Sequence, residues 1–327
     1  MRYLTGMGNV REVRIARRTG FCYGVREAID KAKEAAAAGK VTHTLGQVVH
    51  NEGVIAALQA QGIETVDTLD QVMEGAAVVI RAHGVRPDVL RNAEARGLDV
   101  IDGTCTWVIQ EQREITKCVE EGYAIVLLGT PRHPEVVGLL GFAPDAIVVD
   151  EEEDWDKIPR RKKMALLSQS TQPPWKFEKL AAFMVGRCHE LKIVNTVCPV
   201  TIHRQQDTIE AAQGVDLMLV VGGRSSANTK ELTRLCGIAG TPAIQIESEA
   251  DLTDASVFGD ALVVGVTGGT STPIEDLRCV AERVLKLAGT TQAMADAVGL
   301  ANAALAAAAT PAGRTTSLPD LQVAVAR

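Results

Sequence analysis

Aromatic residues are scarce in this 327-residue sequence, and Phe, Trp and Tyr together make up 3% of it. Proteins that bind single-stranded nucleic acid stack bases on aromatic side chains, so this scarcity argues against that class. An excess of basic residues is also missing, because 34 Lys and Arg stand against 41 Asp and Glu. The net charge of −7 argues against nonspecific nucleic-acid binding, although a local site for a small anion remains open.

Long hydrophobic runs are lacking as well. No apolar stretch approaches the ~18 residues that would suggest a membrane span. The N-terminal sequence MRYLTGMGNVREVRIARR has no apolar segment of the kind found in signal peptides. We therefore predict a cytoplasmic protein that does not bind a membrane. Structural disulfides are rare in that compartment, so the seven cysteines are expected to be buried thiols or ligands.

Several common cofactor motifs are absent. There is no Cys-x-x-Cys pair, which argues against a zinc ribbon and a thioredoxin-like site. There is no P-loop and no Gly-x-Gly-x-x-Gly, so a nucleotide is not the obvious ligand. The length and the 46% hydrophobic content are ordinary for a globular protein with two or three packed units.

What the sequence does contain is one plan repeated three times. Each copy has an extended segment, a cysteine and a helix, followed by two strand–turn–helix units. The cysteines are Cys22, Cys105 and Cys198. A polar residue follows each cysteine after 28 positions, namely His50, His133 and Ser226. A second polar residue follows after 61, 65 and 73 positions, namely His83, Ser170 and Ser271.

The alternation of short apolar strands with helices predicts an α/β fold of parallel sheets covered by helices. Ligands of such sheets bind beyond the carboxyl ends of the strands, where helix N-termini attract anions. We predict three pseudo-repeated units whose strand ends converge on one cavity. Their expected ranges are 12–104, 105–197 and 198–289, with the N-terminal strand also able to pair with the third unit. The Ala-rich tail, 290–327, is expected to be a marginal helix followed by disorder.

Three thiols around one centre suggest a metal or cluster site. Zinc and an iron–sulfur cluster are both candidates, and three ligands without a fourth fit a [4Fe–4S] cluster with one open iron. The alternative is that these are ordinary buried thiols. The matched contexts favour ligand roles for Cys22, Cys105 and Cys198. The other four cysteines lie in helical patterns and are interpreted as structural, namely Cys118, Cys188, Cys236 and Cys279.

Two turns carry further chemistry. In TPRHPEVVG, His133 and Glu135 directly follow an apolar strand, an arrangement that suits a metal, an anion or acid–base catalysis. The glycine-rich TGGTSTP, 267–273, opens a helix and can hold phosphate with backbone N–H groups. A ring of polar side chains around an anion is therefore expected, formed by His50, His83, His133, Ser226, Asn228 and Ser271.

Nine motifs occur in order between residues 20 and 273: GFCYGV, LGQVVHN, AHGV, DGTC, RHPEVVG, SQST, VCPVTIHRQ, GGRSSANT and VTGGTSTP. Together they resemble the 4-hydroxy-3-methylbut-2-enyl diphosphate reductase family, of the methylerythritol phosphate route to isoprenoids. The resemblance implies a trefoil of three α/β units around a central cavity with one [4Fe–4S] cluster. The implied cluster ligands are Cys22, Cys105 and Cys198.

The resemblance also implies the reaction. The allylic diphosphate would lose its hydroxyl as water, using two electrons and two protons, to give isopentenyl and dimethylallyl diphosphates. Glu135 is the expected acid, acting directly or through Ser170, and His133 faces the same site. The expected diphosphate-binding residues are His50, His83, His133, Ser226, Asn228 and Ser271, with Ser225 and Thr201 in addition. The implied electron donor is a ferredoxin or flavodoxin.

The sequence departs from the family pattern in four places. Thr106 follows Cys105 where proline is usual, Ser170 replaces threonine, Ala227 replaces a phosphate-binding serine, and Thr270 lies in the glycine-rich turn. Rival hypotheses are a cluster-dependent hydro-lyase, a zinc hydrolase and a noncatalytic iron–sulfur sensor. Glu135 argues against the sensor, and the lack of a fourth ligand argues against purely structural zinc. We therefore expect an active reductase.

Overall fold

The structure, a computed structural model, describes residues 10–49, 51–224 and 226–289. They form three four-stranded sheets in which every strand pairs parallel to its neighbours. The chain divides into two compact units. Within the described residues, unit 1 comprises 10–22, 51–52, 200–224 and 226–289, and unit 2 comprises 23–49 and 53–199.

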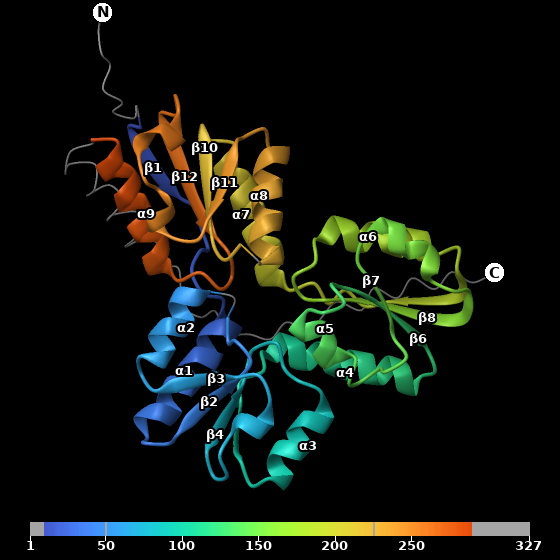
Figure 1. Cartoon of the computed structure of the whole chain (residues 1–327). Coiled ribbons are helices and arrows are strands. Elements are labelled where there is room, and N and C mark those ends of the chain that lie inside the picture. The colour runs from blue at the N-terminus through green and yellow to red at the C-terminus, as the bar shows by residue number, and fades with distance from the viewer. Residues whose placement is uncertain (1–9, 50, 225, 290–327) are drawn as a thin grey trace, which may run out of the picture. The chain divides into compact units, whose positions relative to one another are not determined.

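Unit 1 contains one sheet, in the order β1-β12-β10-β11. Its strands are β1 (Glu12–Ile15), β10 (Leu217–Val221), β11 (Ala243–Ile246) and β12 (Val263–Gly268). Its α-helices are α7 (Pro199–Ala212), α8 (Ala227–Ile238) and α9 (Ile274–Leu287). Alternate residues of β10 pack in different cores, Leu219 with α9 and Met218 with α7 and α8 (Figure 1). Because helices cover both faces, β10 is apolar throughout.

Unit 2 contains two sheets, in the orders β3-β2-β4-β5 and β7-β6-β8-β9. The first is built from β2 (Thr42–Leu45), β3 (Ile63–Val66), β4 (Ala77–Ile80) and β5 (Asp99–Asp102), with α1 (Tyr23–Ala37), α2 (Glu52–Gln59) and α3 (Pro87–Ala95). The second is built from β6 (Ala124–Leu128), β7 (Ile147–Val149), β8 (Arg161–Ser168) and β9 (Cys188–Ile193), with α4 (Thr106–Glu120), α5 (Pro134–Leu139) and α6 (Pro174–Met184). Short 3₁₀ helices are η1 (Leu69–Gln71), η2 (Glu152–Lys157), η3 (Glu249–Asp251) and η4 (Ala255–Phe258).

All three sheets share one strand plan. Each has two central strands, β2 and β4, β6 and β8, or β10 and β12, and an outer strand beside the second of them. That outer strand is β5, β9 or β1, and each is followed by a cysteine of the repeat: Cys105, Cys198 or Cys22. The repeated polar residues follow the central strands. The predicted α/β class with three repeated units is therefore confirmed.

Cys188 was expected in a helix, which is wrong: α6 ends at Met184, and Cys188 begins β9, which pairs with β8. Sheet pairing overrides the local helical pattern there. The unit boundaries stay predictions, and the tail at 290–327 lies outside the described residues. No helix within the described ranges is long and apolar enough to cross a membrane.

Candidate functional site

The turn after β6 holds the predicted acid of unit 2. Helix α5 begins at Pro134, a residue whose fixed φ and missing N–H suit a first helical position. His133 caps this helix, and its Nδ1 accepts a hydrogen bond from the Glu135 N–H at 3.2 Å. The imidazole and the carboxyl are therefore fixed relative to each other by the start of one helix.

Glu135 is buried and firmly held. The residue is only 2% exposed to solvent. Ser170, in the turn after β8, donates its backbone N–H to Glu135 Oε1 at 2.6 Å and its hydroxyl to Oε2 at 2.7 Å. Burial raises the pKa of Glu135 above its ordinary value, although both bonds from Ser170 lower it. The outcome is a carboxyl that holds its proton more tightly than usual, as a general acid should.

The two histidines that the structure describes at this edge lie together. The rings of His83 and His133 are 5.2 Å apart between centroids, at an interplanar angle of 89°. His83 follows β4 and His133 follows β6, so the two sheets of unit 2 bring these turns to one place. This pairing fits the predicted anion-binding role of both imidazoles.

Backbone bonds tie the two thiols of unit 2 to the same turns. The Cys198 N–H donates to the Ser170 carbonyl at 2.8 Å, and the Cys105 N–H donates to the Ala82 carbonyl at 3.0 Å. Both cysteines are half-buried. A Cβ atom at position 24 would lie 2.5 Å from the Cys105 sulfur, so Gly24 leaves space there that no other residue would leave.

Unit 1 carries four of the predicted site residues, namely Cys22, Ser226, Asn228 and Ser271. The Cys22 N–H donates to the Thr270 carbonyl at 3.1 Å, beside Ser271. Ser226 caps α8 and accepts the N–H of Thr229 at 3.3 Å. Asn228 is 5% exposed, and neither polar atom of its amide has a partner among the described residues. Buried amides are normally hydrogen-bonded, so Asn228 at a helix N-terminus suits an anionic ligand.

Comparison with known proteins decides the family. The family model described as LytB protein matches residues 13–285. The chain belongs to the LytB family. Curated relatives named 4-hydroxy-3-methylbut-2-enyl diphosphate reductase include one from Pelobacter propionicus, 36% identical over 79% of this chain and 92% of its own. One from Geobacter metallireducens is 35% identical over 84% of this chain and 98% of its own. This LytB chain is therefore an oxidoreductase.

Solved structures agree with this assignment. A structure of (E)-4-hydroxy-3-methyl-but-2-enyl diphosphate reductase, described as the terminal enzyme of the non-mevalonate pathway, has a TM-score of 0.66 and 30% identity. The match covers 84% of this chain and 99% of the chain in that structure. The corresponding reductase from Plasmodium falciparum has a TM-score of 0.79 over 88% and 90% of the chains. At 24% identity it supports the fold alone.

Arg204 is a residue of this LytB chain that supports two of the predicted site turns and that the sequence analysis missed. It is 3% exposed and lies in α7. Its guanidinium donates to the carbonyls of Gly268 and Gly269 at 2.9 and 2.7 Å and to that of Gly20 at 2.8 Å. It thereby joins the loop before Cys22 to the turn before Ser271. Its position as a basic residue within the VCPVTIHRQ motif was the sequence signal that could have identified it.

Three predicted binding residues and the three predicted cluster ligands are left to place. His50 and Ser225 lie outside the described residues, and Thr201 is buried in α7 of unit 1. Cys22 belongs to unit 1, whereas Cys105 and Cys198 belong to unit 2. In the part of the chain that the structure describes, no three His, Cys, Asp or Glu side chains form a metal-binding group. The cluster ligands therefore stay predictions.

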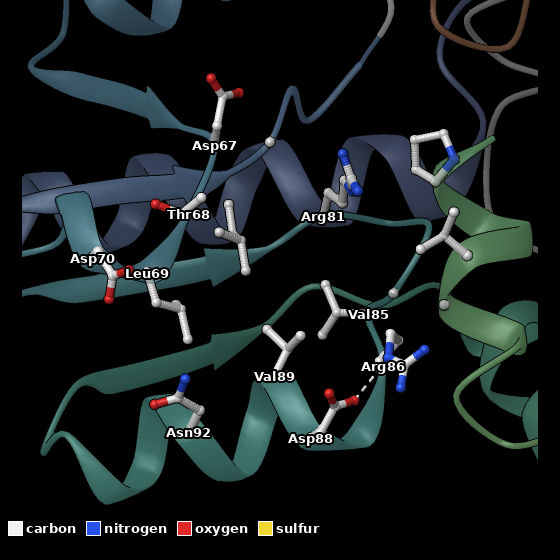
Figure 2. Close-up of a pocket in the computed structure, with 16 residues that line it drawn as sticks. Asp67, Thr68, Leu69, Asp70, Arg81, Val85, Arg86, Asp88, Val89 and Asn92 are labelled. Atoms are coloured by element: carbon white, nitrogen blue, oxygen red, sulfur yellow. Dashed lines mark hydrogen bonds and ion pairs between the residues drawn. The ribbon is translucent and has the colours of Figure 1, made fainter. Parts of the chain in front are cut away.

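A cavity of about 430 Å³ lies at the carboxyl edge of the β2–β4 sheet. Figure 2 shows it between the chain after β4 and helix α3, with the Arg86–Asp88 ion pair on its wall. Gly84 and Val137 also line it, but neither His83 nor Glu135 does. The cavity is therefore separate from the side chains of the candidate site.

Proposed function

We propose that this chain reductively dehydroxylates 4-hydroxy-3-methylbut-2-enyl diphosphate to isopentenyl and dimethylallyl diphosphates. The observation that carries the proposal is the buried Glu135 carboxyl, held by Ser170 beside the Cys198 turn. Hydroxide is a poor leaving group, so its removal as water requires an acid of this kind. The names of the related reductases support the choice of substrate.

Cys22, Cys105 and Cys198 are the residues that would hold a [4Fe–4S] cluster, one per chain. Their chemistry fits, because the thiols form no disulfide in the described part of the chain and each is half-buried. The space that Gly24 leaves beside the Cys105 sulfur fits as well. When bound, such a cluster would supply single electrons and, at the iron without a protein ligand, a Lewis acid.

The diphosphate would be bound by neutral donors and imidazoles. Ser226, Asn228 and Ser271 supply hydroxyls and an amide, and the unpartnered Asn228 side chain supports this role. The N-terminus of α8 adds a favourable electrostatic field for an anion. The remaining predicted contacts are His50, His83, His133, Ser225 and Thr201. Binding the diphosphate positions the allylic carbon chain for reaction.

Glu135 would donate the proton that turns the leaving hydroxyl into water, directly or through the Ser170 hydroxyl. The reaction consumes two electrons and two protons in all. Electrons would come one at a time from a small redox protein of the ferredoxin or flavodoxin type. This donor and the cytoplasmic location stay predictions.

The decisive experiment is turnover by the anaerobically purified full chain after cluster loading. The allylic diphosphate and a reduced viologen dye are supplied, and dye oxidation and both products are measured. We expect consumption of the diphosphate, and none with the Cys105→Ser variant. No consumption by cluster-loaded protein would contradict the proposal. Turnover without reductant would favour the hydro-lyase, and zinc in place of iron and sulfide would favour the hydrolase.

A further inference from the structure

Arg81 is a cation that the proposed reaction does not use. It follows β4 directly, and its guanidinium packs against Gly46, where a Cβ atom would collide with Nη1 of Arg81. Arg81 forms no hydrogen bond or ion pair within the described residues, and its Nε is buried. A guanidinium carries five N–H donors, and desolvating them without an acceptor is costly. The unused donors therefore indicate a site for an anion.

Nearby acids do not supply that acceptor. Burial alone lowers the pKa of Arg81, and among the described residues no carboxylate acts in the opposite direction. Two acids of the cavity wall, Asp70 and Asp88, are each bonded to another arginine. A third, Asp67, is exposed, and Figure 2 shows its carboxyl apart from the Arg81 guanidinium. Arg81 therefore carries a charge that its described neighbours do not balance.

The cavity at the carboxyl edge of the β2–β4 sheet gives the guanidinium room for a ligand. Arg81 lines it, and its volume of about 430 Å³ lies within the range of small-molecule sites. A further part of the wall is aliphatic, formed by Leu69 in η1, Val85 before α3, Val89 in α3 and Val137 in α5. Val137 is 42% exposed, so it offers apolar surface to a ligand. An apolar body therefore fits beside the anionic group.

We propose that this cavity is a ligand site for a small amphipathic anion, distinct from the candidate site. A carboxylate or phosphate head would accept parallel N–H bonds from the Arg81 guanidinium, whose planar fork matches both groups. The apolar body would lie along Leu69 and Val137. Neither His83 nor Glu135 lines the cavity, so this site does not rest on the proposed reaction.

Isothermal titration calorimetry of the full chain without substrate tests the site. Hexanoate and hexyl phosphate share a tail and differ in the head group, whereas hexanol and inorganic phosphate each carry one feature alone. We expect one or both of the amphipathic anions to bind once per chain, and hexanol and phosphate to bind roughly tenfold more weakly or less. The tighter of the two anions identifies the head group. Hexanol binding as tightly as the anions, or no binding of either anion, would overturn the proposal.

Competition separates this cavity from the candidate site. Excess inorganic diphosphate should leave the affinity for the bound hexyl anion unchanged, because the predicted diphosphate-binding side chains do not line the cavity. Displacement by diphosphate would place the hexyl anion in the candidate site and overturn a separate site. This result is independent of whether the chain turns over the allylic diphosphate.

Two pairs of variants test the two parts of the cavity. Arg81→Gln should weaken binding roughly tenfold or more, because it removes the charged donor. Arg86→Gln is the matched control, since Arg86 lines the same cavity but already pairs with Asp88. Val137→Asp should also weaken binding, whereas Val119→Asp, at a valine 43% exposed on α4, should not. Equal losses within either pair would contradict the assigned contacts.

Urea unfolding shows whether Arg81 serves a ligand or the fold. Without a ligand, Arg81→Gln should be at least as stable as wild type, because it removes a desolvated charge that lacks a partner among the described residues. Adding the hexyl anion should stabilise wild type but not Arg81→Gln, since only the folded wild type binds it. A less stable Arg81→Gln protein would show that the guanidinium supports the fold, and would overturn its role as a ligand anchor.

Discussion

The turns after β10 and β12 in unit 1 occupy the same places in their sheet as the turns after β6 and β8 in unit 2. The first pair carries Ser226, Asn228 and Ser271, which are uncharged donors. The second pair carries His133, Glu135 and Ser170, with a buried carboxyl at the centre. One repeated fold position therefore carries two kinds of chemistry, uncharged donors in unit 1 and a buried carboxyl in unit 2.

The supports of these turns differ in the same way. In unit 1, a buried cation, Arg204, bonds the backbone carbonyls of Gly20, Gly268 and Gly269. In unit 2, Ser170 bonds the carboxylate of Glu135 itself. Changes in unit 1 should therefore alter binding and stability, whereas changes in unit 2 should alter rate and pH dependence.

Glu135→Gln should have the largest effect on turnover, because it removes the acid and keeps the shape of the side chain. We expect turnover to fall by about 10²- to 10⁴-fold, the usual contribution of a general acid. Iron and sulfide content should stay at the wild-type level, since no cysteine changes. Viologen oxidation measures the turnover, and metal analysis measures the iron and sulfide content. A wild-type rate would mean that the acid lies elsewhere and would remove the distinction between the two units.

The repeat itself made much of this site predictable. The shared spacing of 28 residues placed His133 and Ser226 at equivalent strand ends, and the structure confirms those places. Pro134 marked the start of α5. The helical period of 3.6 residues and the apolar pattern of the strands were sufficient to place these turns, because parallel strands bring their carboxyl ends to one edge of a sheet.

Glu111 and Arg204 were not predictable in the same way. A glutamate or an arginine in a helix usually lies in solvent, and only packing shows that these two are buried. Glu111 occupies an inward position with Val108 and Ile115, so its helical spacing was a usable signal. The partners of Arg204 lie 64, 65 and 184 residues away in the chain, which no local pattern reveals.

Arg204→Gln should have the next largest effect, on stability. It removes charge-assisted bonds to three buried carbonyls, and we expect a loss of about 2–4 kcal/mol in the free energy of unfolding. Urea unfolding of the full chain measures it. Arg14→Gln is the matched control, because Arg14 pairs with Glu12 at the surface and contributes less than about 1 kcal/mol. Equal losses in both variants would show that Arg204 does not support the unit 1 turns.

Asn228→Ala should weaken substrate binding rather than slow the reaction. A hydrogen bond to a charged group contributes about 1.5–3 kcal/mol, which corresponds to roughly a 10- to 150-fold rise in KM. Ala227→Ser should act in the opposite direction, because it restores a hydroxyl at the first residue of α8. Steady-state kinetics with the allylic diphosphate separates KM from kcat. A fall in kcat alone would place Asn228 with the proton-handling residues instead.

Ser170→Ala should have the smallest effect on the reaction. The direction in which it shifts the pH profile of kcat is the informative result. The Ser170 hydroxyl lowers the pKa of Glu135 by bonding its ionised form, so removing it should raise that pKa. Because the reaction needs protonated Glu135, the alkaline limb of kcat should move to higher pH by about one pH unit or less, as one neutral hydrogen bond allows.

Ser170→Thr is the matched control, since it keeps the hydroxyl and restricts its rotamer. Its pH profile should overlay that of wild type. Both variants keep the backbone N–H that donates to Glu135 Oε1, so neither should release the carboxyl from its place. A shift of the Ser170→Ala limb to lower pH would mean that the hydroxyl stabilises protonated Glu135, and that Ser170 passes the proton rather than holding the anion.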